Sequence, residues 1–189
     1  VITTDPACRS PVRYPWENAE IHRLPWREKR VLVHALGARS AMQDYLTGLQ
    51  PNVIHAHDLY GIMVKGMPVP RVFTIHGFIH ADTLQARDRL AWLRSRIWRR
   101  LELANWADQP HVISISPYVR ERLRDVTAAT IHDIENPIAE DFFHVERRET
   151  RGTIFCAALI SPRKNILGVI EALDQIIQAG VKAQLRVAG

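Results

Sequence analysis

The chain has 189 residues, of which 47% are hydrophobic and 24% charged, and its formal net charge at pH 7 is +5. These fractions are ordinary for a soluble globular protein, and this length can bury a core without disulfides or metals. The sequence has no run of about 18 apolar residues, which excludes a membrane-spanning helix.

The cysteines and the first residues bear on the cellular setting. Cys8 and Cys156 are far apart, and Cys156 lies in an apolar run. We therefore expect a buried free thiol rather than a disulfide, which favours a reducing, cytoplasmic location. Val1 to Asp5 resembles a strand rather than a signal peptide, and the missing initiator Met indicates a piece of a longer chain.

The first 50 residues predict a strand, a loop and a helix. Val1 to Thr4 predicts the strand, and four prolines then predict an irregular loop to about residue 27. Trp16 and Trp26 in this loop are expected to pack, with lining of an acceptor cleft as the alternative. Apolar residues between 31 and 49 recur at helical spacing and predict one helix.

Two short apolar runs then end in histidine. Val53-Ile54 leads into HAHD (55–58), and residues 72–75 lead into His76-Gly77, with a short helix expected over 59–67. Such runs, stopping at polar residues and glycine, indicate buried strands. Ligands of open α/β sheets bind beyond the carboxyl ends of the strands. The pattern therefore places five residues along one candidate site: His55, His57, Asp58, His76 and Gly77.

The same pattern recurs twice downstream. Residues 112–115 lead into Ser116, and residues 130–134 lead into Glu135-Asn136-Pro137. Pro117 directly after Ser116 predicts the start of a helix that runs to about residue 125.

The segment from Gln85 to Ala104 carries six arginines against two acidic residues. Its apolar residues follow a helical spacing: Leu90, Leu93, Ile97, Leu101 and Ala104. One interpretation is a helix that packs this stripe into the core and solvates its cationic face. The other is a helix on a membrane surface, with arginines on anionic headgroups and tryptophans at the interface. Nucleic-acid binding is disfavoured, because the basic residues form one helix face without an aromatic platform motif.

After a charged linker, residues 153–157, 165–179 and 183–188 predict a strand, a helix and a strand. Arg163-Lys164 lies in the loop before that helix. Two cations at a helix N-terminus form an anion site, because the helix dipole and its free N–H groups add to their charge. The alternative is an exposed basic loop.

Three interpretations compete for the histidines. His55 and His57, at i and i+2 of a strand, point the same way and could share a metal, as in metal-dependent hydrolases. Alternatively, histidines at strand ends hydrogen-bond loop carbonyls and serve structure alone. In the third interpretation, neutral imidazoles and loop amides bind sugar hydroxyls and phosphate. His76-Gly77 suits the third, since glycine lets a ligand approach the backbone.

Five blocks of sequence together resemble the large family of retaining GT-B glycosyltransferases that includes bacterial glycan and glycolipid synthases. They are PNVIHAHD (51–58), RVFTIHG (71–77), VISISPYVRERL (112–123), IENPI (134–138) and SPRKN (161–165). Each block alone is weak, but five in the family's order and at its usual separations are specific. The resemblance covers roughly residues 30 to 189.

The resemblance implies an α/β fold of GT-B type with two Rossmann-like domains facing a cleft. An acceptor-side, parallel-sheet domain without its first strand would occupy residues 1–145, and a linker residues 146–152. The first β-α-β unit of a nucleotide-sugar-binding domain would occupy residues 153–189. Parts of both domains would lie outside this piece, so we expect it to have no transferase activity alone.

The implied activity is transfer of a hexose-type sugar from a nucleotide-diphosphate donor to a glycan or lipid-linked acceptor, with retention of configuration. His76 would be the catalytic residue, and Arg163 and Lys164 would hold the donor diphosphate. The remaining site residues would line the acceptor side or the cleft: His55, His57, Asp58, Gly77, Ser116 and Asn136. No metal or other cofactor is expected, because cationic side chains stabilise the leaving diphosphate. The basic helix over 85–104 is the candidate contact with the inner face of a membrane.

One departure from the family concerns the donor side. The family often has Gly-Arg-Leu after the first strand of the donor domain, where this chain has Ala157-Ala158-Leu159. Either Arg163 takes over the contact of the missing arginine with diphosphate, or donor binding is weaker. On this ground a non-catalytic sugar-nucleotide-binding module stays an alternative, beside the metal-dependent hydrolase.

Overall fold

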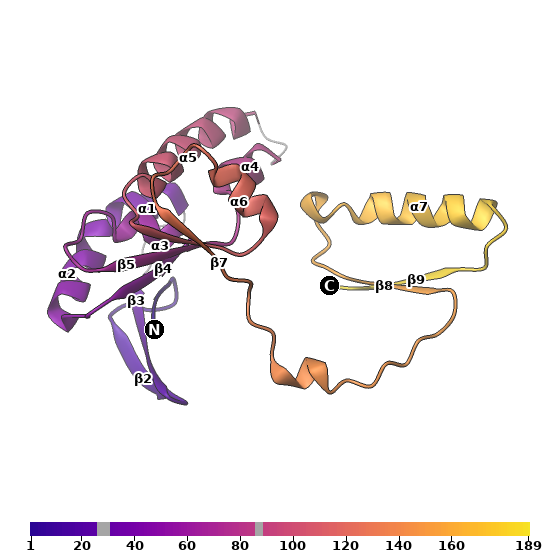
Figure 1. Cartoon of the computed structure of the whole chain (residues 1–189), viewed down its shortest axis with the longest axis horizontal. Coiled ribbons are helices and arrows are strands. Elements are labelled where there is room, and N and C mark those ends of the chain that lie inside the picture. Colours follow the sequence, from indigo (N-terminus) through magenta and orange to yellow (C-terminus); the bar gives the residue numbers. More distant parts are fainter. Residues whose placement is uncertain (26–30, 86–88) are drawn as a thin grey trace.

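The computed structural model of the protein describes residues 1–25, 31–85 and 89–189 and shows an α/β fold (Figure 1). Four short strands form a wholly parallel sheet in the order β4, β5, β6, β7. They span Ile54–His57, Arg71–Ile75, His111–Ser114 and Thr130–Asp133. Each overlaps a predicted run, so the predicted parallel sheet is confirmed.

Within the residues that the structure describes, six helices precede or connect these strands. They are α1 (Val31–Gly37), α2 (Arg39–Leu49), α3 (Leu59–Met63), α4 (Ile79–Leu84), α5 (Ala91–Trp106) and α6 (Pro117–Leu123). The single helix predicted over 31–49 is in fact α1 and α2, which break at Ala38. Gly37 directly before the break is a poor helix former, which explains why the apolar period alone missed it.

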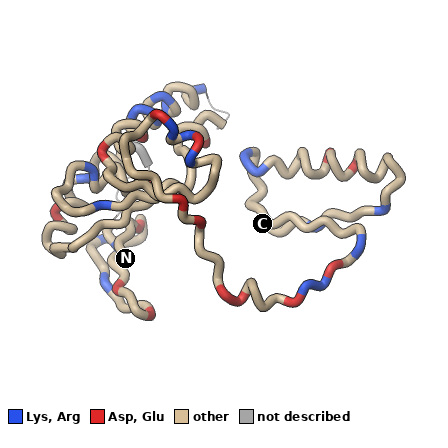
Figure 2. The backbone as a smooth tube through the Cα atoms, in the orientation of Figure 1, with Lys and Arg blue, Asp and Glu red and all other residues tan. Residues whose placement is uncertain are grey.

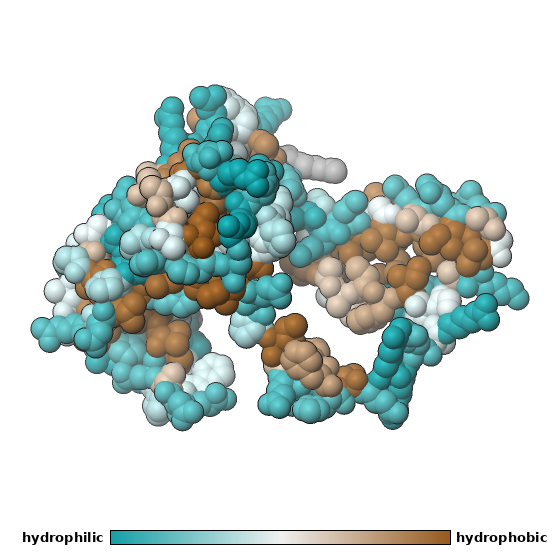
Figure 3. Space-filling view, in the orientation of Figure 1, coloured by the Kyte–Doolittle hydropathy of each residue, from teal (hydrophilic) through white to brown (hydrophobic). Residues whose placement is uncertain are grey.

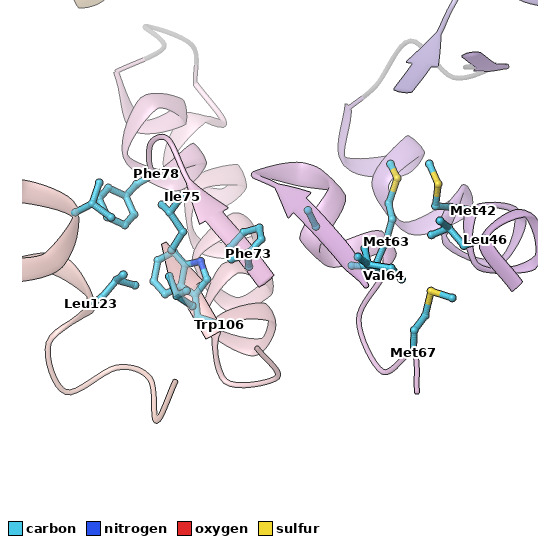
Figure 4. Packing of buried hydrophobic residues seen from close by; sticks show 14 of the residues in the cluster. Met42, Leu46, Met63, Val64, Met67, Phe73, Ile75, Phe78, Trp106 and Leu123 are labelled. Carbon is cyan, nitrogen blue, oxygen red and sulfur yellow. The ribbon is translucent and has the colours of Figure 1, made fainter. Parts of the chain in front are cut away.

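The two faces of the parallel sheet differ in burial. In register across the sheet, Ala56, Phe73 and Val112 are buried and Ile131 is half-buried. This row packs into the main core, which Figure 4 shows as one group around Trp106 and another around Met63. Full burial of a side chain such as that of Phe73 or Val112 stabilises the fold by about 1.5–3 kcal/mol. The opposite face carries four exposed histidines: His55, His57, His111 and His132.

The prediction of an irregular loop to about residue 27 is wrong, because most of residues 12–25 lie in strands. Residues 2–25 form a small sheet in the order β1 (Ile2–Asp5), β3 (Ala19–Pro25) and β2 (Val12–Trp16). Pro15 is compatible with a strand here because β2 is an edge strand, where a missing N–H costs little. Trp16 is exposed rather than packed, and Trp26 lies outside the described residues.

Helix α5 buries a different face from the predicted one. The buried residues are Ala91, Ser95, Trp98, Glu102, Asn105 and Trp106. Four of the five predicted core positions, namely Leu90, Leu93, Ile97 and Ala104, are exposed. The basic segment predicted over 85–104 therefore corresponds to α5 at Ala91–Trp106, and residues 86–88 lie outside the described chain. The buried face combines its apolar residues with Ser95 and Glu102, which hydrogen-bond α4 as described below.

A second, smaller unit follows residues 134–152, which contain the 3-10 turn η1 (Glu140–Phe143). It consists of β8 (Thr153–Ala157), the 3-10 turn η2 (Pro162–Lys164), α7 (Ile166–Gln178) and β9 (Gln184–Ala188). Strands β8 and β9 are parallel, so this is the predicted β-α-β unit. We call β1 to β7 the first lobe and β8 to β9 the second lobe, and Figure 1 shows the extended connection between them.

Two further findings concern the whole described chain. Among the described residues no helix is long and apolar enough to cross a membrane. Both cysteines carry free thiols, but Cys156 is half-buried rather than buried.

We predict that Gly61→Ala destabilises the first lobe. A Cβ at Gly61 of α3 would collide with the Phe73 ring and would lie 2.6 Å from Nδ2 of Asn105. Overpacking of this kind lowers the free energy of unfolding by about 1–3 kcal/mol. Gly48→Ala in α2 is the matched control, because a Cβ there meets nothing within 4 Å. Alanine there should stabilise the helix by up to about 1 kcal/mol. Urea denaturation of both variants measures the difference, and equal stabilities would contradict the prediction.

Candidate functional site

Two histidines meet where β4 and β5 end. Nδ1 of His57 lies 2.9 Å from Nε2 of His76, and the two rings stack with centroids 5.2 Å apart and an interplanar angle of 15°. One ring nitrogen therefore donates a hydrogen bond to the other. His57 is the last residue of β4 and His76 directly follows β5, so the parallel register brings them together.

Asp58 holds the backbone of the same loop. Its Oδ1 accepts a hydrogen bond of 2.9 Å from the N–H of His76. The backbone of Asp58 has φ 41° and ψ −113°, a conformation that a residue with a side chain rarely adopts. Strained backbone of this kind is typical of functional sites, where the surrounding structure maintains it.

His55 extends the cluster along β4. Its ring centroid lies 4.3 Å from that of His57, and its Nε2 is 2.7 Å from Oγ1 of Thr74 on β5. Residues at i and i+2 of a strand share a face, which explains why the two imidazoles lie side by side. The three exposed rings form one cluster: His55, His57 and His76.

The surroundings of His57 favour its neutral form. Partial burial lowers the pKa of His57 below its ordinary value, and the nearby His55 and His76 rings lower it further, while Asp58 opposes them. A neutral imidazole has one donor and one acceptor nitrogen, which suits it to hydroxyl groups. Gly77 next to the cluster leaves open space, since a Cβ there would meet nothing within 4 Å.

Ser116 and Asn136 follow the ends of the next two strands, β6 and β7, as predicted. Ser116 caps α6, where its Oγ accepts a hydrogen bond of 3.3 Å from the N–H of Val119. Its carbonyl accepts from Oγ of Ser114 at 2.9 Å. Asn136 is exposed in the chain that leaves β7. The structure therefore gives Ser116 a structural contact and leaves Asn136 open to solvent.

The basic turn of the second lobe lies beside the first lobe. Arg163 and Lys164 are exposed in η2, and Figure 2 shows this basic turn at the end of the second lobe that faces the first. Nε of Arg163 is 3.2 Å from Oδ1 of Asp82, which belongs to α4. Helix α4 begins three residues after His76, so this ion pair links the turn to the helix that follows the histidine loop.

The described residues hold no group of three or more His, Cys, Asp and Glu side chains arranged for a metal ion.

Sequence reasoning missed two features. Nε2 of His132 and Nδ1 of His111 lie 3.3 Å apart on the open sheet face, and their strands were predicted but not their register. Glu102 was counted only as a charge in the basic segment, although it is 5% exposed and contacts α4. Its spacing of seven from Ser95 and four from Trp98 was the available signal.

The parallel sheet of the first lobe and the β-α-β unit of the second lobe correspond to a fold of GT-B type. The model of Glycosyltransferase Family 4 matches residues 1–142, and the chain belongs to that family. A sucrose-phosphate synthase from Thermosynechococcus elongatus has the same fold, with a TM-score of 0.70 and 17% sequence identity. The similarity covers 100% of this chain and 51% of that one, so the chain spans about half the length of the solved relative. No curated protein matches the sequence.

We predict that His57 makes the fold less stable in mild acid. The pKa of His57 is lower in the folded chain than the value of about 6.5 in an unfolded one. The unfolded state therefore binds more protons between these two values, and the free energy of unfolding falls as pH decreases through that window. His57→Asn should reduce this fall, which denaturation at pH 8 and pH 5 measures.

His76→Gln tests the cause of the shift. It removes a second imidazole that competes for protons, so the pKa of His57 should rise in an NMR titration. An unchanged titration of His57 would show that its neighbour has no influence.

Proposed function

We propose that this protein transfers a sugar from a nucleotide-diphosphate donor to a glycan or lipid-linked acceptor, with retention of anomeric configuration. The observation that supports it is the hydrogen-bonded pair of His57 and His76 at the ends of two strands. The carboxylate of Asp58 accepts a hydrogen bond from the backbone N–H of His76. A basic turn from the second lobe reaches the helix that follows this loop. Imidazole nitrogens can hydrogen-bond the hydroxyl groups of a sugar, and the basic turn can bind a diphosphate.

In this proposal His76 orients the transferred sugar, and His55, His57, Asp58 and Gly77 line the acceptor side. The acceptor oxygen bonds to the anomeric carbon on the face from which the nucleoside diphosphate departs. The bond from that carbon to the donor phosphate oxygen breaks with its electron pair on the leaving oxygen, which also takes the proton of the acceptor hydroxyl. Arg163 and Lys164 hold that diphosphate and stabilise the negative charge that develops on it. In this proposal two cationic side chains do this without a metal ion. Ser116 and Asn136 would extend the cleft along β6 and β7.

His76→Ala in the full-length protein tests the catalytic assignment. Loss of a positioned imidazole typically lowers a rate by about 10²–10⁴-fold, so kcat should fall by at least about 100-fold. His111→Ala is the matched control, because His111 is also an exposed histidine of this sheet but lies at the start of β6. Equal transfer rates in the two variants would instead favour a non-catalytic binding module.

The donor side is tested by nucleotide binding, with UDP, GDP and ADP as probes in calorimetry. Arg163→Ala and Lys164→Ala should each weaken binding of the accepted nucleotide by about 10-fold, since each removes a charged contact with phosphate. Asp82→Asn should strengthen it by up to about 5-fold, because an exposed ion pair that competes for Arg163 is worth up to about 1 kcal/mol. Lys182→Ala, an exposed lysine of the same lobe, is the control. A loss as large in that control would contradict the assignment.

We further propose that α5 contacts the inner, cytoplasmic face of a membrane. The helix exposes an apolar stripe, with Trp92 57% exposed. Arginines accompany this stripe and are exposed as well: Arg89, Arg96, Arg99 and Arg100. Exposed apolar and aromatic side chains beside arginines suit the interface of an anionic bilayer.

Co-sedimentation with vesicles tests this contact. Replacing Arg96, Arg99 and Arg100 by Ser should reduce binding to vesicles that contain anionic lipid, by roughly 1 kcal/mol for each arginine. Replacing Arg147, Arg148 and Arg151 of the linker by Ser is the matched control. Binding that is unaffected by the α5 changes would remove the proposed contact.

A further inference from the structure

We propose that Glu102 of α5 is a positioning residue that fixes the loop carrying His76 and Gly77. The inference rests on the proposed sugar transfer at that loop, and it assigns a role to a residue that is remote in sequence from the histidines. The reasons are the burial of Glu102, the hydrogen bonds of its carboxylate and the shortness of the loop.

Glu102 caps α4 from a different helix. Its Oε1 accepts from the N–H of Ile79 at 2.7 Å, and its Oε2 accepts from the N–H of His80 at 3.1 Å. Nδ1 of His80 lies 2.6 Å from the same Oε2. The first N–H groups of a helix have no partner within the helix, and Phe78 at the N-cap position supplies none from its side chain. The carboxylate of Glu102 therefore satisfies the start of α4.

Helix α5 also holds the other side of His80. Oγ of Ser95 donates a hydrogen bond of 2.7 Å to the carbonyl of His80. Ser95 and Glu102 lie seven residues apart, on one face of α5, and both are buried. These two hydrogen-bonding residues share the buried face of α5 with Ala91, Trp98 and Trp106.

Only two residues separate this anchor from His76. Gly77 has no side chain, and Phe78 is buried with its ring 5.6 Å from that of Trp106 in an edge-to-face contact. At the other end of the loop, Asp58 accepts from the N–H of His76. Two carboxylates from different elements thus hold the loop at both ends, Asp58 next to His76 and Glu102 at the start of α4.

A buried carboxylate is a costly way to stabilise a fold. Removing a charged group from water costs several kcal/mol unless hydrogen bonds compensate, and an apolar residue of similar volume is often at least as stable. The geometric effect of Glu102 is more specific, because the carboxylate sets the position of two consecutive amides. Residues that preorganise a site in this way raise turnover by holding the reacting groups in place.

A double-mutant cycle in the full-length protein tests the inference. Glu102→Gln keeps the volume but replaces one accepting oxygen by an NH₂ group that cannot accept. If Glu102 acts through His76, this change should lower kcat by about 10-fold or more in the wild type, and by less than about 2-fold in His76→Ala. An equal loss in both backgrounds would overturn the inference, since independent effects add. Glu121→Gln, an exposed carboxylate paired with Arg124 at 2.7 Å on α6, is the matched control.

NMR of the histidine rings supplies a readout that a merely structural role would not move. In Glu102→Gln, the ring signals of His57 and His76 should shift and hydrogen exchange at Ile79 and His80 should accelerate by about 10-fold or more. A lower melting temperature with unchanged ring signals would overturn the inference. If Glu102→Gln does not fold, Ser95→Ala removes a single anchor of His80 and should move the same signals less. The absence of any shift in Ser95→Ala would then count against the inference.

The same data separate this inference from the proposed function. If the ring signals shift in Glu102→Gln but His76→Ala retains full transfer, the positioning stands and the catalytic role of His76 fails. If His76→Ala lowers kcat by about 100-fold but leaves it measurable and the cycle is additive, the catalytic role stands and the positioning fails.

Discussion

The parallel alignment of β4 to β7 is the constraint on which the candidate site depends. Because all four strands run the same way, each strand delivers its last residues to the same edge of the sheet. Backbone hydrogen bonds continue past the strand ends, from the N–H of Asp58 to Thr74 and from the N–H of Ile134 to Ser114. These bonds fix where each polar loop begins. The contact between His57 and His76 follows from that register, since neither residue could reach the other from antiparallel neighbours of this length.

The polar contacts that hold the candidate site each carry a cost in folding free energy. Asp58 has a rarely adopted backbone conformation, and Glu102 is a buried carboxylate. Each places its oxygens on backbone N–H groups around the short loop from His76 to Phe78. The hydrophobic core under the sheet supplies the free energy that compensates for these costs, with Phe73, Ile75 and Trp106 among its buried residues. The core thus lies on one face of the sheet, and the polar residues of the candidate site lie at its carboxyl edge.

The two lobes differ in how well they cover their apolar surface. The first lobe buries one face of its sheet, whereas the second lobe is a single β-α-β unit with exposed apolar side chains, which Figure 3 shows along α7 and its strands. Phe155, Leu159 and Leu167 are among those exposed. A parallel pair of strands with one helix leaves its other faces uncovered. The ion pair of Arg163 with Asp82 is consequently a contact between an exposed cation and α4 rather than part of a packed interface.

The sequence by itself determined the α/β class, the parallel strands and the histidines at their ends, because apolar runs that stop at polar residues depend on local pattern alone. It also placed the cap of α6 at Ser116, since Ser-Pro is a local signal. Tertiary structure alone decided which face of α5 is buried, because Glu102 and Ser95 hydrogen-bond α4 while Trp98 and Trp106 pack into the core from the same face. It likewise decided that residues 12–25 form strands and that Arg163 meets Asp82. These outcomes depend on partners distant in sequence, and local periodicity contains no information about such partners.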